Sequence, residues 1–440
     1  MVMTNRIGQM ILSGLLLVMV TACGSKEVIL PGERSAILAV ETLPEIDLAA
    51  ASEGAQMGEV LPNIIYSQSG LMASHRGGHL ALEWPLQRAW SVSIGVDTDL
   101  GTLMASPIAN QVSVFGVTPD AQLTAVNLND GSIRWRMEIE PRADKTQPAV
   151  SGGLALENDQ IFAHAGGKML VSLNADDGAV LWDRRFDLPL MGGPTAIDGR
   201  VAVTDIDGRL FVLSASDGAV LWSRVGNPES TRVLGASSPA IHNGELVLTG
   251  NDAELSVLTL DRGELLWGDD LSVRTPRTAL DNINSIVAHP VYDSNMVFVG
   301  SMSGRFAAYN TQTGSQSWEI GVATHQQPWV AGKTVFAVSA KGRVYAIRRQ
   351  DGSIRWISAL PGAVPLNLTV SDDAMRYVGP IAAGGRIIVI DQNGKGLFLD
   401  PDTGAILDSQ AFGAAQSGAP IIVSGTLIIL DDRGRLSAYR

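Results

Sequence analysis

Cysteine is nearly absent from this sequence, which has only one, Cys23, among its 440 residues. A single thiol cannot form a disulfide within the chain, and no later cysteine is available as a nucleophile. The Gly-x-Ser-x-Gly motif that presents the serine nucleophile of α/β-hydrolases is missing as well. The sequence therefore offers no starting point for a covalent catalytic mechanism.

Basic residues are also scarce. Lys and Arg number 32 against 45 Asp and Glu, which gives a formal net charge of −13. The chain contains no long basic run and no basic amphipathic helix. Because phosphate recognition depends on clustered Lys and Arg, nucleic acid is excluded as a partner.

Residues 1–22 have the pattern of a secretory signal peptide. Arg6 precedes an apolar stretch from Ile11 to Val20, which is too short to span a membrane as a helix. The adjoining Val20-Thr21-Ala22-Cys23 resembles the lipobox of bacterial lipoproteins, in which the cysteine is acylated and becomes the first mature residue. We therefore predict that Cys23 is lipidated and anchors the protein to a membrane without spanning it.

The residue after the lipobox cysteine bears on location. In bacterial lipoproteins an aspartate there favours retention in the inner membrane, whereas this chain has Gly24. The resemblance implies a lipid anchor on the periplasmic face of the outer membrane of a Gram-negative bacterium. Residues 23–62 lack β periodicity and are rich in Ala, Glu, Gly and Pro, so we expect a flexible tether there. Residues 63–440 are expected to form one repeat domain.

Tryptophan marks a repeat along that domain. Six times a glycine is followed four residues later by tryptophan, and a seventh copy, Gly404/Asp408, keeps only the glycine. A period of roughly 40 to 50 residues is typical of propellers and solenoids. The six pairs are Gly131/Trp135, Gly178/Trp182, Gly218/Trp222, Gly263/Trp267, Gly314/Trp318 and Gly352/Trp356.

Each repeat predicts four short antiparallel strands. The unit from Pro194 to Trp222 has three Asp-Gly pairs between apolar runs, and such pairs favour type I′ hairpins, in which both central residues have positive φ. Runs such as Thr334 to Val338 and Thr426 to Leu430 are apolar at successive positions. Such strands are buried on both faces, which fits blades stacked around an axis.

The two ends of the repeat domain predict how the ring closes. A proline opens each of eight units, but the last unit, from Pro420, supplies only three strands before the chain stops at Arg440. The missing strand carries tryptophan in the other units, and Gln87 to Val92, with Trp90, precedes the first unit. We predict an all-β, eight-bladed propeller of four-stranded antiparallel blades, closed by that N-terminal strand.

The repeated tryptophans need no ligand to explain them. Their recurrence at one position predicts packing between neighbouring blades, where a large aromatic side chain buries on the order of 150 to 250 Å². The aspartate at position 408 predicts one weaker junction near the closure. The predicted blade-junction residues are Trp90, Trp135, Trp182, Trp222, Trp267, Trp318 and Trp356.

Blades of this kind, eight in number, resemble the pyrroloquinoline-quinone type of β-propeller. Together with the lipobox and the acidic tether, they resemble the BamB family, the propeller lipoproteins of the outer-membrane β-barrel assembly (Bam) machinery. The resemblance implies a non-enzymatic scaffold without a cofactor. Its implied partners are the periplasmic POTRA domains of a BamA-like insertase, the other Bam lipoproteins, and unfolded outer-membrane proteins as clients.

Two other functions stay open at this stage. Quinoprotein dehydrogenases share the fold, so one alternative is a periplasmic redox module that holds a quinone-like ligand on the axis. The vicinal cysteine pair of those enzymes is missing here, since Cys23 is the only cysteine. The other alternative is a structural tether for a different envelope complex.

The metal-like motifs have simpler explanations. Asp205-Ile206-Asp207-Gly208 resembles the start of a calcium loop, but the twelfth position is Ser216 instead of the required glutamate. A hairpin accounts for this motif. His75 and His79 are spaced for a metal only on a helix, and Gly77 and Gly78 between them argue against one, so an exposed loop is expected. No metal site is predicted.

Long connections between blades are the expected sites of partner binding. The stretches from each blade-ending tryptophan to the next proline include three long ones, 223–238, 268–289 and 357–379, and the first two follow consecutive blades. By resemblance to the BamB family, the first loop contributes an arginine and apolar cluster and the second contributes acidic residues, although this chain has amides such as Asn284 where more carboxylates are expected. The predicted partner-binding residues are Arg232, Val233, Leu234, Asp281 and Asn284.

Overall fold

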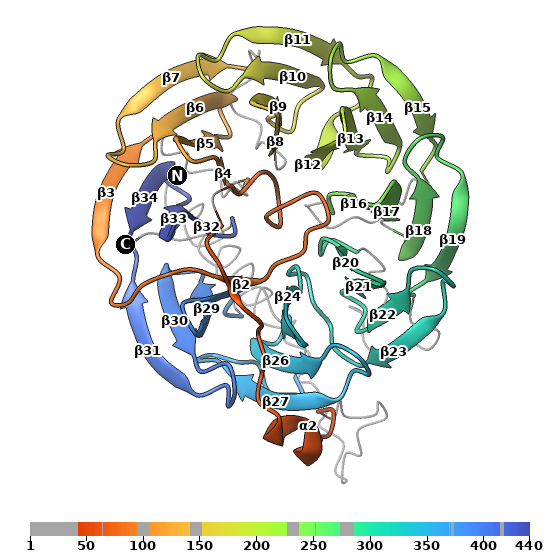
Figure 1. Cartoon of the computed structure of the whole chain (residues 1–440), viewed down its shortest axis with the longest axis vertical. Helices are drawn as coiled ribbons and strands as arrows, with labels where there is room; N and C mark the ends of the chain where they lie inside the picture. Colours follow the sequence, from red (N-terminus) through yellow and green to blue (C-terminus); the bar gives the residue numbers. More distant parts are fainter. Residues whose placement is uncertain are drawn as a thin grey trace, which may run out of the picture. The chain divides into compact units, whose positions relative to one another are not determined.

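Eight four-stranded antiparallel sheets surround a common axis in the computed structural model of the chain (Figure 1). The predicted all-β, eight-bladed propeller is thereby confirmed. Within the described ranges the one helix is α2 (Leu48–Ser52), and none is long and apolar enough to cross a membrane. The structure describes residues 43–63, 65–95, 105–140, 152–226, 237–250, 252–272, 286–368, 370, 374–413 and 418–440.

We number the blades in chain order and call the strand nearest the axis the first strand. Blades 1 to 4 are β4 (Ile108–Ala109), β5 (Ser113–Val117), β6 (Gln122–Asn127), β7 (Ile133–Glu138); β8 (Gly153–Glu157), β9 (Gln160–His164), β10 (Met169–Asn174), β11 (Val180–Arg185); β12 (Leu190–Ile197), β13 (Arg200–Asp205), β14 (Leu210–Ser214), β15 (Val220–Arg224); and β16 (Ala240–His242), β17 (Glu245–Thr249), β18 (Glu254–Thr259), β19 (Leu265–Asp270).

Blades 5 to 8 complete the circle, and the last takes its fourth strand from the N-terminal part of the chain. They are β20 (Val291–Asp293), β21 (Met296–Gly300), β22 (Phe306–Asn310), β23 (Gln316–Ile320); β24 (Trp329–Ala331), β25 (Thr334–Val338), β26 (Arg343–Arg348), β27 (Ile354–Ala359); β28 (Tyr377–Ala383), β29 (Arg386–Asp391), β30 (Lys395–Leu399), β31 (Ile406–Ala411); and β32 (Ile421–Val423), β33 (Thr426–Leu430), β34 (Arg435–Tyr439) with β3 (Arg88–Ser93).

The ring closes as predicted. β3 pairs antiparallel with β34, with Trp90 opposite Ala438. The backbones of Gln87 and Arg440 exchange two hydrogen bonds of 2.7 and 2.9 Å, which extend the pairing beyond the ladder. The second strands are buried along both faces, and β21, β25 and β33 have no exposed position. Stacking of neighbouring blades therefore supplies the core.

The hairpin turns differ in part from the prediction. Asp198 and Gly199 have φ values of 53° and 72°, as a type I′ turn requires. At the turns of Gly208 and Gly218 only the glycine has positive φ, 73° and 69°. The second of these turns adjoins a register shift between Val212 and Leu213, because a bulge absorbs the extra turn residue.

Each blade-ending tryptophan bonds to the next blade around the ring. The indole Nε1–H of Trp182 donates to the carbonyl of Ala215 at 2.8 Å, and the ring lies against Gly218, where an added Cβ would come within 2.7 Å of it. Glycine is required there both for its positive φ and for this close approach. The other pairs are Trp90 with Leu128, Trp135 with Ala175, Trp222 with Leu260, Trp267 with Thr311, Trp318 with Arg349 and Trp356 with Pro401.

The junction between blades 7 and 8 has no such tryptophan, because the corresponding position on β31 is Asp408, which is exposed. Phe412 fills part of the junction, with its ring 4.8 Å from that of Tyr439 in an edge-on arrangement. The Tyr439 hydroxyl donates to the Phe412 carbonyl at 3.2 Å. Gln410 donates to the carbonyl of Leu86 at 3.3 Å, so the N-terminal segment also covers this junction.

The expected tether is wrong for residues 43–62, which pack on the ring. Ile46 forms a parallel bridge to Ile354 of β27. Asp47 caps α2 by accepting from the amides of Ala49 and Ala50 at 2.8 and 3.0 Å. β1 (Val60–Leu61) and β2 (His79–Leu80) extend the sheet of blade 7. The tether prediction failed because these contacts join residues about three hundred positions apart, which local periodicity cannot register. Signal peptide residues 1–22 and Cys23 lie outside the described residues.

We predict that Trp182→Ala lowers the free energy of unfolding by about 3 to 5 kcal/mol, because it removes a large buried ring and its hydrogen bond from a blade junction. Urea unfolding measures this change. The matched control is Leu181→Ala on the same strand, whose side chain is 51% exposed and which should cost less than about 0.5 kcal/mol. Equal effects of the two substitutions would contradict the junction role.

Candidate functional site

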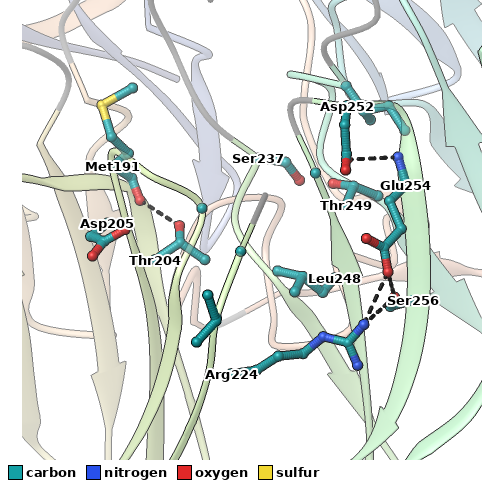
Figure 2. Close-up of a pocket in the computed structure, with 15 residues that line it drawn as sticks. Met191, Thr204, Asp205, Arg224, Ser237, Leu248, Thr249, Asp252, Glu254 and Ser256 are labelled. Atoms are coloured by element: carbon teal, nitrogen blue, oxygen red, sulfur yellow. Dashed lines mark hydrogen bonds and ion pairs between the residues drawn. The ribbon is translucent and has the colours of Figure 1, made fainter. Parts of the chain in front are cut away.

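A cleft opens at the rim of the ring between blades 3 and 4. It encloses a cavity of about 50 Å³, lined by the ends of β12, β13 and β15 on one side and by β17 and β18 on the other (Figure 2). The β13–β14 and β17–β18 turns border it at Gly208 and Gly250. In a four-stranded meander these turns lie on the same face as the connections between blades. The cleft is therefore on the connection face.

The first long connection begins and ends at this cleft, and the second reaches it near its end. Val225 and Gly226 follow β15, Ser237 precedes β16, and Ile286 belongs to the connection that leads to blade 5, and all four line the cavity. Val225 is 82% exposed, although it is apolar. The five predicted partner-binding residues lie within these connections but outside the described residues: Arg232, Val233, Leu234, Asp281 and Asn284.

An ion pair joins the two sides of the cleft. Arg224 Nη2 lies 3.0 Å from Glu254 Oε1 and donates to the Ser256 hydroxyl at 3.4 Å, and Ser256 also donates to Glu254. The Arg224 and Glu254 side chains are 31% and 41% exposed, so their pairing contributes at most about 1 kcal/mol to stability. A partner can therefore exchange with this pair at little cost. The sequence analysis missed Arg224, although its place two residues after Trp222 at the mouth of a long loop was visible.

The calcium-like motif forms a turn, as expected. Asp205 Oδ1 accepts from the amides of Asp207 and Arg209 at 3.0 and 2.9 Å. Burial raises the pKa of the Asp205 carboxyl. Asp391 and Asp431 accept from backbone amides two and four residues ahead in the same way. In the part of the chain that the structure describes, no group of three His, Cys, Asp or Glu is placed to hold a metal ion.

His75 does not lie in an exposed loop, and that expectation is corrected. Its side chain is fully buried, and its Nδ1 lies 2.8 Å from the Pro290 carbonyl. The ring of His289 is 5.3 Å away. His79 is less buried, and its Nε2 accepts from the Gly385 amide at 3.0 Å. The two glycines between these histidines exclude a helix, as expected, but they permit close packing against the ring.

Residues 119–358, more than half of the chain, match the sequence model of a family described as outer membrane protein assembly factor BamB. The chain belongs to the BamB family. It is 22% identical over 357 residues to the BamB of Yersinia pestis, covering 80% of this chain and 88% of the relative. It is 23% identical over 348 residues to the BamB of Escherichia coli strain K12, covering 78% and 85%.

Solved structures agree with the BamB fold. The crystal structure of BamB from Moraxella catarrhalis matches with a TM-score of 0.67 at 17% identity, covering 81% of this chain and all of that one. Quinohemoprotein alcohol dehydrogenase from Comamonas testosteroni matches with a TM-score of 0.65 at 12% identity, covering 89% and 84%. The shared propeller does not separate assembly factors from dehydrogenases. The sequence match places the chain among the BamB proteins.

The buried His75 and His164 and the partly buried His289 are expected to make the stability of this BamB-family ring depend on pH. Burial, with the nearby His289 as a smaller cause, lowers the pKa of His75 to about 3, and burial lowers the pKa of His164 and of His289 to about 4. Each is neutral in the folded protein near pH 5, whereas in the unfolded chain it takes up a proton below about pH 6.5. Their contribution to stability is thus fully present above pH 6.5 and is lost as the pH falls toward 4.

We predict that each of these histidines lowers the free energy of unfolding by about 2 kcal/mol when the pH falls from 7 to 5. His75→Asn should therefore reduce the difference between urea unfolding free energies at the two pH values by about that amount. The control Thr204→Val removes a buried hydroxyl bonded to Met191 and does not titrate, so it should lower stability equally at both pH values. An unchanged pH difference in His75→Asn would contradict the account.

Proposed function

We propose that this protein is a non-enzymatic scaffold lipoprotein of the outer-membrane β-barrel assembly machinery. In this proposal it is anchored through Cys23 at the periplasmic face of the outer membrane and docks on the POTRA domains of a BamA-like insertase beside the other Bam lipoproteins. It assists the insertion of β-barrel proteins. Membership in the BamB family supports the assembly role, and the cleft between blades 3 and 4 supports docking through the connection face.

The proposed docking site rests on the residues that line the cleft. It combines an exposed apolar residue, Val225, with the weakly held Arg224 and Glu254 pair, at the base of two consecutive long connections. Interfaces concentrate binding energy in a few apolar or arginine anchors surrounded by polar groups. A cavity of about 50 Å³ has room for a few water molecules, whereas a quinone cofactor needs several hundred. The cleft is thus suited to a protein surface.

We predict that replacing Arg232 and Leu234 by alanine weakens capture of the insertase by the purified protein. Truncation of interface anchors commonly costs about 2 kcal/mol or more, and each 1.4 kcal/mol lowers affinity about tenfold. Stability should change little, because both residues lie outside the blade strands. The matched control replaces Ile406 and Leu407 by alanine. These side chains are 43% and 52% exposed on the outer strand of blade 7, and their replacement should leave capture unchanged.

Equal capture by the double variant and the unmodified protein would place the docking site elsewhere. If the unmodified protein captures no insertase but binds a quinone at one molecule per chain, the redox alternative is the better account. Both measurements use the same purified protein.

We predict that Cys23→Ser releases the protein from the outer membrane, because the serine cannot accept the lipid that anchors the chain. Membrane fractionation of cells that carry the variant measures this. The expected result is a soluble periplasmic or unprocessed form. An outer-membrane fraction equal to that of the unmodified protein would disprove the anchor.

A further inference from the structure

The N-terminal segment between residues 63 and 82 crosses the centre of the ring and contacts all eight blades. Figure 1 shows it passing between the first strands at the centre of the ring. The bonds, from blade 1 to blade 8, are Ala109 with Tyr66 (two, 2.8 Å each), Leu156 N–H to Ser67 O (2.7 Å), Ala196 N–H to Gln68 Oε1 (2.8 Å), Ile241 N–H to Ala73 O (2.7 Å), Tyr292 N–H to Ser74 O (2.9 Å), Trp329 Nε1–H to Gly78 O (2.8 Å), Gly384 N–H to Leu80 O (3.0 Å) and Ser424 N–H to Asn63 O (2.7 Å).

Most of these contacts use the inner edge of a sheet, and in blade 6 the donor is the Trp329 indole instead. The first strand of a blade has no neighbour toward the axis, so its backbone groups there are open to another chain. The segment occupies them with main-chain atoms in most blades, and in blade 3 with the buried Gln68 amide. That amide accepts from the Ala196 N–H and donates to the Ala196 carbonyl at 3.3 Å. The inner edge thus binds an extended peptide as a sheet binds an added strand.

Side chains of the segment fill the centre of the ring. Tyr66, Leu71 and Leu80 are each at most 2% exposed and belong to a hydrophobic cluster that includes strands of blades 6 to 8. Gly77 lies so close to the Trp329 ring that an added Cβ would come within 2.5 Å of it. Burial of these three side chains removes apolar surface from water and so stabilises the bound segment.

The segment contacts both ends of the first strands. Its partners Leu156, Ser424 and Gly384 are at or beside the turns between first and second strands, at the far end of the blade from the connections. Its partners Pro290 and Gln327, which bond to His75, precede first strands at the connection end. None of the described residues between 63 and 82 lines the cleft, so docking there is compatible with the segment at the centre of the ring.

We propose that the centre of the ring is a peptide-binding site whose ligand is the chain's own residues 63–82, and that this plug stays in place while the protein works. This inference rests on the proposed scaffold function and deepens it. Because the plug remains, partners and clients bind the outside of the ring and its connection face, and no client segment passes through its centre.

A disulfide that locks the plug tests this. An ideal Cβ on Gly193 of blade 3 lies 3.8 Å from the Cβ of Ser69, which matches the separation found in disulfides. We combine Ser69→Cys with Gly193→Cys in a Cys23→Ser background, which has no other thiol. The control pairs Ser69→Cys with Gly116→Cys, whose Cβ would meet Ile94 and Leu430 instead. The first pair should form a disulfide on oxidation and the control should not.

Capture of purified insertase is then compared for the locked and the reduced protein. Equal capture, within about twofold, supports a permanent plug. Failure of the first pair to oxidise overturns the plug geometry, and loss of capture on locking, restored by reduction, overturns its permanence.

Capture that fails even in the Cys23→Ser parent overturns the proposed function and not the plug. Hydrogen exchange of the parent then decides the plug, using the amides of Leu156, Ile241, Tyr292 and Ser424, which donate to it. Exchange as slow as in β9 and β17 supports the plug. Fast exchange of these four amides, with β9 and β17 protected, overturns it.

Discussion

The contact between each blade-ending tryptophan and the glycine turn of the next blade determines how this ring is assembled. The indole supplies a large apolar surface and one hydrogen bond, as in the 2.8 Å bond from Trp182 to Ala215, and the glycine allows the two backbones to approach. Because the same contact recurs at seven junctions, each blade is held mainly by its neighbours. The ring is then as stable as its weakest junction, which explains why the closure at blades 7 and 8 recruits additional aromatic residues and the N-terminal segment.

The centre of the ring and the cleft have different roles in this account. The centre receives the chain's own N-terminal residues, which bond to all eight blades. The connection face presents the cleft, where the Arg224 and Glu254 pair is partly exposed and the apolar side chain of Val225 is 82% exposed. The groups that bond to the chain's own N-terminal segment are thus separate from the groups exposed to a partner at the cleft.

The sequence predicted the features of the fold that repeat from blade to blade. The Gly-x-x-x-Trp spacing predicted the repeat, the eight prolines predicted the blade count, and the incomplete last unit predicted that the strand of Trp90 closes the ring, where Trp90 lies opposite Ala438. It did not predict the ordered residues 43–62 or the plug, because these residues have no period and bind partners far away in the chain. Gly70 and Gly77, which approach Gln327 and Trp329 closely, were the local signal of such packing.

The site was less predictable than the fold for the same reason. The loops could be located from their length, but Arg224, Glu254 and Ser256 become one cluster only when the third and fourth strands of adjacent blades are placed side by side. The exposure of His75 was predicted wrongly. Two neighbouring glycines suggest an exposed loop, and the sequence does not show that this loop packs at the centre of the ring.

Photocrosslinking in cells from position 225 tests the central claim most directly. A photoreactive amino acid in place of Val225, which is 82% exposed beside the cleft, should crosslink to the β-barrel insertase. The same amino acid in place of Leu407, 52% exposed on blade 7, should not. Crosslinks to the insertase from both positions, or from position 407 alone, would contradict docking through the cleft, and their absence from both would contradict the assembly role itself.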